Sequence, residues 1–282
     1  DTLNHSVNLG WSTTYQNWSF RAFHATSISK DPLVETGRQT EQTTHSTSAG
    51  ATLDMASRGS WDTSISQTFR FTDIANDVTS WGWQNAYDIP FREKLRLGVG
   101  LDLGYDAIDP GTDMMDQRLT ARANGTLGDK IGYSLSAGAS FREFVDSDAS
   151  TAISPVVSFN LSYDLLERTR FTAGVNHEAS SSYFSDQYTQ NTSFQGSVSQ
   201  GLTERWSVSA SGGYRISDYE STVLDTGTQR EDSTLFARVA VSARVLNRLS
   251  ATVSYSFRSN SSDQNDFGFD SNQVGLTVNW SL

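Results

Sequence analysis

The sequence contains no cysteine, so neither a disulfide framework nor a thiolate metal site can form. It also has no apolar run near the roughly 18 residues that a membrane-spanning helix needs, which excludes a helical membrane protein. Basic residues are outnumbered, with 21 Lys and Arg against 32 Asp and Glu. The resulting net charge of −11 argues against a nucleic-acid-binding protein.

What the sequence does contain is a long alternation of apolar and polar residues. From Trp206 to Ile216, every second residue is apolar or glycine, and serine, glycine and arginine fill the gaps. The stretches 95–105 and 249–258 alternate in the same way. Because successive side chains of a β-strand point to opposite faces, each stretch predicts a strand with one apolar face and one polar face.

The length of these strands separates two fold classes. A soluble β-sandwich turns its apolar faces inward and usually has strands of about five or six residues. Here the strands run to about ten residues or more, the length that crosses the hydrocarbon of a membrane at a tilt. The sequence therefore predicts an all-β, transmembrane, antiparallel β-barrel in the bacterial outer membrane. Its apolar residues would face lipid and lipopolysaccharide, and its polar residues would face water.

Fifteen strands can be counted, in a single domain that covers residues 1–282. Bacterial single-chain barrels have even strand numbers, so we expect about 14 to 16 strands and favour sixteen, with an upward strand that precedes Asp1. A miscounted strand within 27–45 and a parallel closure of an odd barrel are the alternatives. The strands counted are 6–15, 17–26, 44–56, 61–72, 81–89, 95–106, 117–127, 131–144, 153–165, 169–178, 189–202, 206–217, 233–245, 249–259 and 272–282.

The connections between these strands alternate in length and charge. Short turns with a basic residue, such as 56–60 and 90–94, belong on the periplasmic side, and long loops belong outside. The longest loop, 27–45, and the loop 218–232 could each fold inward as a constriction. The other long acidic loops expected are 106–116, 143–148 and 263–270.

The last strand carries a short pattern that outer-membrane barrels present to their assembly machinery. Gln273, Gly275, Val278 and Trp280 fit the order polar, glycine, apolar and aromatic, although the final Leu282 departs from the usual terminal Phe or Trp. The pattern predicts the barrel-assembly machinery as a partner.

The end of the chain also resembles a known group of barrels. The run from Tyr255 through Arg258, Ser259 and Asn260, followed by an acidic loop and by 272–274, is similar to porin-like outer-membrane barrels encoded with exopolysaccharide and capsule systems. The resemblance implies an outer-membrane location and a porin-like barrel, and some members of these families help polysaccharide to cross the outer membrane.

The polar faces of the predicted strands carry more arginine than acid, which predicts a net basic pore wall. Arginines on this face would give the pore a preference for anions or sugar acids, because charged rings set the selectivity of pores. In the alternative interpretation, these arginines pair with nearby acids and only brace neighbouring strands. Arg70, Arg142, Arg215 and Arg258 are expected in the outer half of the lumen. The pore-lining residues predicted are Arg21, Arg70, Arg96, Arg122, Arg142, Arg215, Arg238, Arg258, Asp102 and Glu178.

The sequence favours a passive pore or export conduit for small solutes or saccharide, with no cofactor. The competing hypothesis is a scaffold whose barrel holds a lipoprotein or a surface partner. A homo-oligomer is compatible with either hypothesis.

Catalytic and metal sites have weaker support. His177 precedes Glu178 and the serines 180–182, but a serine-rich loop supplies such neighbours by chance, so we expect no enzyme. Asp146 and Asp148, like the group Asp109, Asp113 and Asp116, lack the twelve-residue loop of a typical calcium site, so we expect no specific metal site. 

Overall fold

A computed structural model describes residues 4–145, 150–182, 187–221, 230–246 and 248–280. Within these residues the chain forms one 15-stranded sheet in which every strand pairs antiparallel with the next along the chain. Two short 3-10 helices, η1 (Ala56–Arg58) and η2 (Asn265–Phe267), lie between strands. The strands are β1 (His5–Tyr15), β2 (Trp18–Ser29), β3 (Gln42–Asp54), β4 (Ser60–Thr72), β5 (Asp77–Arg92), β6 (Leu95–Asp109), β7 (Met114–Leu127), β8 (Ile131–Phe144), β9 (Ala152–Leu166), β10 (Thr169–Ser181), β11 (Gln187–Gly201), β12 (Trp206–Ser221), β13 (Arg230–Leu246), β14 (Leu249–Ser262) and β15 (Phe269–Trp280).

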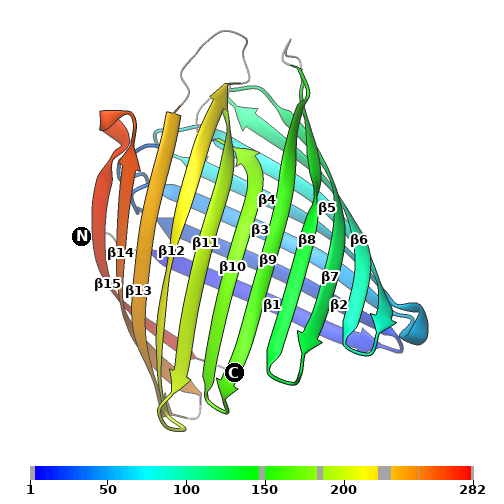
Figure 1. The fold of residues 1–282 in the computed structure, drawn as a ribbon. Helices are drawn as coiled ribbons and strands as arrows, with labels where there is room; N and C mark the ends of the chain where they lie inside the picture. The colour runs from blue at the N-terminus through cyan, green and yellow to red at the C-terminus, as the bar shows by residue number, and fades with distance from the viewer. Residues whose placement is uncertain (1–3, 146–149, 183–186, 222–229, 247, 281–282) are drawn as a thin grey trace.

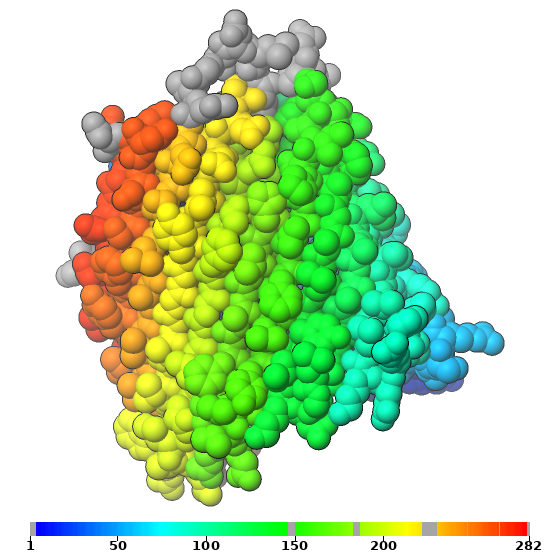
Figure 2. Space-filling model, viewed as in Figure 1, coloured from blue at the N-terminus to red at the C-terminus, as the bar shows by residue number. Residues whose placement is uncertain are grey.

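The sheet curves round on itself into a barrel. In Figure 1 the strands β8–β15 form the near wall, and β1–β6 cross behind them at an angle. The space-filling view from the same side shows the near strands packed into one continuous wall (Figure 2). No helix in the described part of the chain is long and apolar enough to cross a membrane. The predicted fold class and the count of fifteen strands are confirmed.

The two edges of the sheet are β1 and β15, which run in the same direction because fourteen antiparallel pairings separate them. No backbone pairing joins these two strands in the described residues. Side chains do connect their outer ends. Asp31 Oδ1 accepts hydrogen bonds from Asn4 Nδ2 at 3.0 Å and from Gln273 Nε2 at 2.8 Å. The edge strands therefore meet at Asp31, and we call this junction the seam.

The outer face of the sheet is apolar and exposed, as the alternation predicts. Val99 on β6 is 56% exposed and Leu119 on β7 is 59% exposed, although a soluble protein would bury such residues. Exposed Trp206 and Trp280 lie near the short turns, and exposed Tyr105 lies near the long loops. This distribution matches the apolar band with aromatic girdles that an outer-membrane barrel presents to lipid.

The strands extend further at the long-loop end, here called the outer end, than the sequence pattern predicts. Asp116, Asp218 and Asp232 lie inside strands, so the loops predicted at 106–116 and 218–232 are shorter than expected. Glu143 and Asp270 also belong to strands. The prediction was wrong at these ends because strands that leave the apolar band can carry charge on either face without meeting lipid.

Two other connections also differ from the prediction. The segment 56–60 contains η1 rather than a simple turn, and Pro90 lies within β5. The loop predicted at 27–45 runs only from 30 to 41, because β2 and β3 extend into it.

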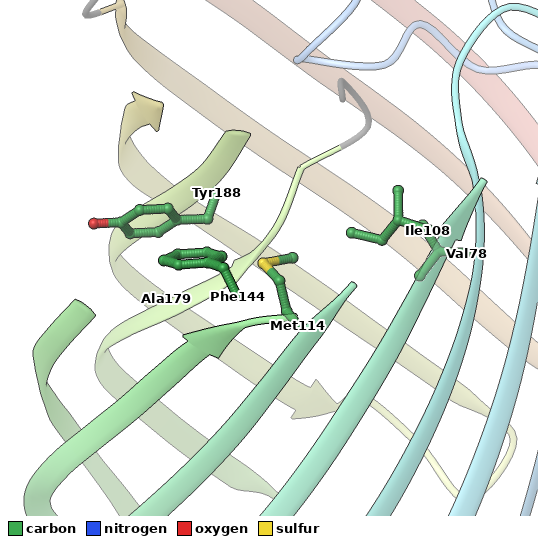
Figure 3. Packing of buried hydrophobic residues seen from close by; sticks show 6 residues of the cluster. All are labelled: Val78, Ile108, Met114, Phe144, Ala179 and Tyr188. Carbon is green, nitrogen blue, oxygen red and sulfur yellow. The ribbon is translucent and has the colours of Figure 1, made fainter. Parts of the chain in front are cut away.

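A small apolar cluster lies at the outer end of the barrel. Met114, Phe144, Ala179 and Tyr188 come from the outer ends of β7, β8, β10 and β11, and all are buried. Val78 and Ile108 lie together a short way from them, at the outer ends of β5 and β6 (Figure 3). Buried apolar contact is therefore concentrated near the mouth, while the rest of the interior is lined mainly by small polar residues.

Candidate functional site

The predicted pore-lining residues share the inner face of the sheet. Arg21 on β2 lies opposite Ser12 and Gly50 in the strand register and forms an ion pair with Asp62 on β4 at 2.9 Å. A contact between strands that are not neighbours requires side chains that converge on the concave side. The register places all the predicted residues on this side, namely Arg21, Arg70, Arg96, Arg122, Arg142, Arg215, Arg238, Arg258, Asp102 and Glu178.

On the wall formed by β7–β10, the arginines are paired with acids. Arg118 Nη1 lies 3.4 Å from Glu178 Oε2, and Arg142 Nη2 lies 3.3 Å from Asp116 Oδ1. The hydroxyl of Ser140 also donates to Asp116. The side chain of Arg142 is only 6% exposed. We call Asp116, Arg118, Arg142 and Glu178 the paired network. It joins the three strands β7, β8 and β10, and such bracing is what the alternative interpretation of the sequence expected.

A polar cavity of about 310 Å³ lies on the inner face beside this network. Arg118 and Arg122 line it from β7, and Asp102 lines it from β6. Arg122 forms a long ion pair with Asp88 on β5, in which Nη2 lies 3.7 Å from Oδ2. Asp102 lies opposite Arg118 in the register, and neither an ion pair nor a hydrogen bond of its carboxylate is found within the described residues. The cavity therefore presents both a carboxylate and guanidinium groups to its contents.

The wall formed by β12–β14 is different. Arg215 and Arg258 are exposed on the inner face, and within the described residues neither forms an ion pair or a side-chain hydrogen bond. Arg238 donates one hydrogen bond, to Ser254 Oγ at 3.1 Å. We call Arg215, Arg238 and Arg258 the open arginines, because no carboxylate of the described residues pairs with them.

The loop between β2 and β3, residues 30–41, reaches across to other strands at the outer end. Arg230 Nη1 on β13 donates to the carbonyl of Glu35 at 2.9 Å. Ser182, just after β10, donates to Glu35 Oε2 at 2.8 Å, and Arg70 Nη2 on β4 donates to the carbonyl of Ser182 at 3.4 Å. These contacts connect strands far apart in the sheet order, so the loop spans the mouth. We call the loop and these contacts the outer bridge.

The outer bridge is anchored by a buried group of side chains. The guanidinium carbon of Arg230 lies 4.0 Å from the ring centre of Tyr219 and 3.7 Å from that of Phe267. Arg230 also pairs with Asp232 at 2.5 Å, and their side chains are 5% and 0% exposed. Gly37 packs directly on the backbone of Phe267 with a positive φ of 63°, so a larger side chain there would collide with it.

The base of the loop is closed by Lys30 and Glu41, whose charged atoms lie 2.6 Å apart. The hydrogen bond with Glu41 raises the pKa of Lys30. Of the two loops that the sequence allows to fold inward, the first crosses the mouth in the structure. Most of the second, residues 222–229, lies outside the described residues.

Sequence reasoning missed Arg230 and Asp232, because it placed them in a loop. The signal that could have found them is their spacing: residues two apart on a strand share a face, and Arg230 and Asp232 continue the inner parity of Arg238. The extra strand length at the outer end hid this parity.

The four arginines expected together in the outer half of the lumen separate into two pairs. Arg142 Nη2 donates to the carbonyl of Ala179 at 3.0 Å, close to the Ser182 carbonyl that Arg70 contacts. Arg215 and Arg258 make no such contact within the described residues. Two of the four arginines, Arg70 and Arg142, therefore contact the outer end of β10. Barrel curvature and strand stagger decide how high each arginine lies in the barrel, so equal positions along the strands do not bring all four together.

The described residues of the discounted sites form no assembled catalytic or metal geometry. His177 Nδ1 is hydrogen-bonded to Thr192 Oγ1 at 2.8 Å, and Ser182 binds Glu35. Asp113 accepts hydrogen bonds from Tyr105 and from the backbone of Ile108. No group of three His, Cys, Asp or Glu side chains within the described ranges is arranged to hold a metal ion. Asp146 and Asp148 lie outside those ranges.

The residues of the predicted assembly signal all lie on β15. Gln273 and Gly275 are on the inner face, and Gln273 takes part in the seam. Val278 and Trp280 point to lipid and are 58% and 62% exposed. Leu282 lies outside the described residues.

No family model and no curated protein matches the sequence. Solved structures do match the fold. The FrpB iron transporter of Neisseria meningitidis is 13% identical with a TM-score of 0.60, and the match covers 91% of this chain and 51% of that one. The alcaligin outer-membrane receptor FauA of Bordetella pertussis is 12% identical with a TM-score of 0.54, covering 100% and 57%.

The chain thus spans a little over half the length of these proteins. At such low identity the likeness shows the fold. Together with the apolar outer face, it defines this chain as a bacterial outer-membrane β-barrel, which confirms the predicted fold class and location.

Proposed function

We propose that this protein is an outer-membrane conduit for small hydrophilic anions, with the outer bridge as its gate. The interior of a barrel of about eight strands is just filled by its own side chains. A barrel of fifteen strands is wider, so its interior has room for water and solute. The inner face is lined by small polar residues and by arginine, as a water-filled passage requires. The fold is shared with proteins named as iron and copper transporters, which supports a transport role.

The observation that carries this proposal is the pair of open arginines Arg215 and Arg258. A guanidinium group that has neither an acid nor a carbonyl as its partner keeps all of its N–H donors for water or a passing solute. Charged groups of this kind set the ion preference of pores. The paired network cannot serve in the same way, because its charges are already compensated within the wall.

The solute class is part of the proposal. Arginine binds carboxylates through two parallel hydrogen bonds, so a sugar acid or an anionic saccharide fits the open arginines best. The similarity of residues 255–274 to barrels of exopolysaccharide systems supports the same class. Iron and copper are named for the similar solved structures, and this proposal does not extend them to this chain.

Planar-bilayer recording of the purified barrel tests the proposal. We expect steady conductance steps that prefer chloride over potassium, and a loss of that preference when Arg215 and Arg258 are both changed to serine. The matched control changes Arg21 and Asp62 to serine, because this removes an inner-face arginine together with the carboxylate that neutralises it at 2.9 Å. Unchanged chloride preference in the double variant would refute a selective role for the open arginines.

A second candidate, a scaffold that holds a lipoprotein or surface partner, has one observation in its favour. The outer bridge crosses the mouth through Glu35, Ser182 and Arg230. A scaffold needs no free passage through its barrel, so a crossed mouth is compatible with that role. Silence of the purified barrel that persists after the bridge is loosened by Gly37→Val would favour the scaffold. We propose no catalytic role, and we retain lipopolysaccharide, the assembly machinery and a homo-oligomer as expected partners.

A further inference from the structure

A second cluster of arginines lies at the opposite end of the barrel, away from the open arginines and the bridge. A cavity of about 450 Å³ is lined there by Arg205, Arg244 and Arg248, together with Val245, Leu246 and Trp280. Arg205 and Arg248 lie in the short turns before β12 and β14, and the other residues lie at the ends of β13 and β15. The backbone amide of Arg244 donates to the carbonyl of Arg205 at 2.8 Å, which holds the turns side by side.

The charge of this cluster is not compensated. All three arginines are exposed, and within the described residues none of them forms an ion pair. Another turn at the same end shows the usual arrangement, in which Lys94 Nζ lies 2.8 Å from Asp129 Oδ1. Two of the three, Arg205 and Arg248, lie in turns, whereas the register gives Arg244 the inner parity of Arg238. Because guanidinium groups match phosphate and carboxylate geometry, the two turn arginines form a candidate anion site.

The apolar residues of the same cavity set its depth in the membrane. Trp280 is 62% exposed and Leu246 is 58% exposed, both near the periplasmic end of the outer face. Trp206, close by on β12, is 51% exposed. Tryptophan concentrates at the level of lipid headgroups. The arginines are therefore placed at headgroup depth, next to apolar surface that acyl chains can cover.

We infer that this cluster binds the phosphate of an anionic phospholipid in the periplasmic leaflet. The phosphate oxygens accept hydrogen bonds from Arg205 and Arg248, and the acyl chains lie along Val245, Leu246 and Trp280. A free phosphate ion shares the first contact but not the second. The inference does not depend on the proposed transport function.

Native mass spectrometry of the barrel with phosphatidylglycerol tests the inference. We expect one retained lipid per barrel, and a loss of affinity of at least about tenfold in Arg205→Gln with Arg248→Gln, since removing one charge-assisted hydrogen bond has an effect of that order. The matched control is Arg58→Gln, an exposed arginine of η1 that lines no such cavity. The heat-dependent shift of the barrel on gels shows that each variant is folded.

The remaining outcomes decide against the inference. Equal lipid retention by the double variant and by Arg58→Gln would overturn it. Displacement of the lipid by millimolar inorganic phosphate would show a soluble-anion site instead. Lipid binding that is unchanged while an acidic periplasmic peptide binds only the wild type would assign the cluster to a protein partner.

Discussion

The inner faces of β7–β10 and β12–β14 use the same side chain in two ways. On β7–β10, Arg118 and Arg142 lie against Glu178 and Asp116 and are partly or fully removed from solvent. On β12–β14, Arg215 and Arg258 lie on the inner face, and no acid in the described part of the chain pairs with them. Whether an arginine is paired within the wall or open to the interior is therefore decided by its neighbours, which lie on the adjacent strand for Arg142 and three strands away for Arg118. Residue type alone does not distinguish the two roles.

The largest expected difference between the two walls is in stability. Asp116→Ala removes the carboxylate beside Arg142, whose side chain is 6% exposed, and leaves a buried charge without its partner. We expect a loss of about 3–5 kcal/mol in unfolding free energy, measured by urea unfolding in lipid vesicles. Arg258→Ser, on the other wall, should change it by no more than about 0.5 kcal/mol. Equal losses would erase the distinction between the walls.

The next effect concerns the bridge, which is fastened to both walls. Arg230→Gln leaves Asp232 buried without its ion pair and removes the ring contacts with Tyr219 and Phe267. Because an anchor loss of about 3 kcal/mol shifts a closed–open equilibrium more than a hundredfold, the open fraction in single-channel records should rise steeply. An open fraction equal to that of the wild type would show that the bridge is not a gate.

A smaller effect should follow when the open wall is made to resemble the paired one. Ser271 lies opposite Arg258 in the register, so Ser271→Asp places a carboxylate beside that arginine. A pair of unit charges about 4 Å apart in water interacts by ~1 kcal/mol, so chloride preference should fall roughly two- to fivefold. Reversal potentials measure it, and Ser271→Asn is the control. A change of equal size in both variants would attribute the effect to side-chain size.

The smallest effect is expected at the exposed pair of Lys94 and Asp129. The hydrogen bond from Lys94 lowers the pKa of Asp129. Because both groups are exposed, the pair stabilises the fold by too little to measure; this small contribution is present at pH values above the usual carboxyl range and is lost as pH falls through the lowered pKa. NMR titration should show the pKa of Asp129 rising toward its ordinary value in Lys94→Gln, with no measurable change in stability. A pKa that stays low would assign the shift to another group.

Much of this architecture is readable from the alternation of residue types. The parity of Leu95 to Tyr105 and of Trp206 to Ile216 gives the lipid face and, with it, the inward direction of the arginines. A period of two leaves no other choice once the apolar face is assigned to lipid. The strand count also followed from this pattern.

The pairing of the arginines could not be read in the same way. Arg118 lies opposite Asp102 in the register but pairs with Glu178, three strands away. That choice depends on barrel curvature and on strand stagger, which a linear pattern does not contain. The contact of Glu35 with Arg230, 195 residues apart in sequence, lies beyond it for the same reason.

Asp31 belongs to the seam and also stands at the root of the outer bridge. Its carboxylate holds Asn4 and Gln273, and the loop that follows it leads directly to the contact with Arg230. Lifting the loop from the mouth must therefore pull on the join between the first and last strands. In the proposed conduit, opening of the outer bridge and separation of the two edge strands are therefore coupled through the Asp31 carboxylate.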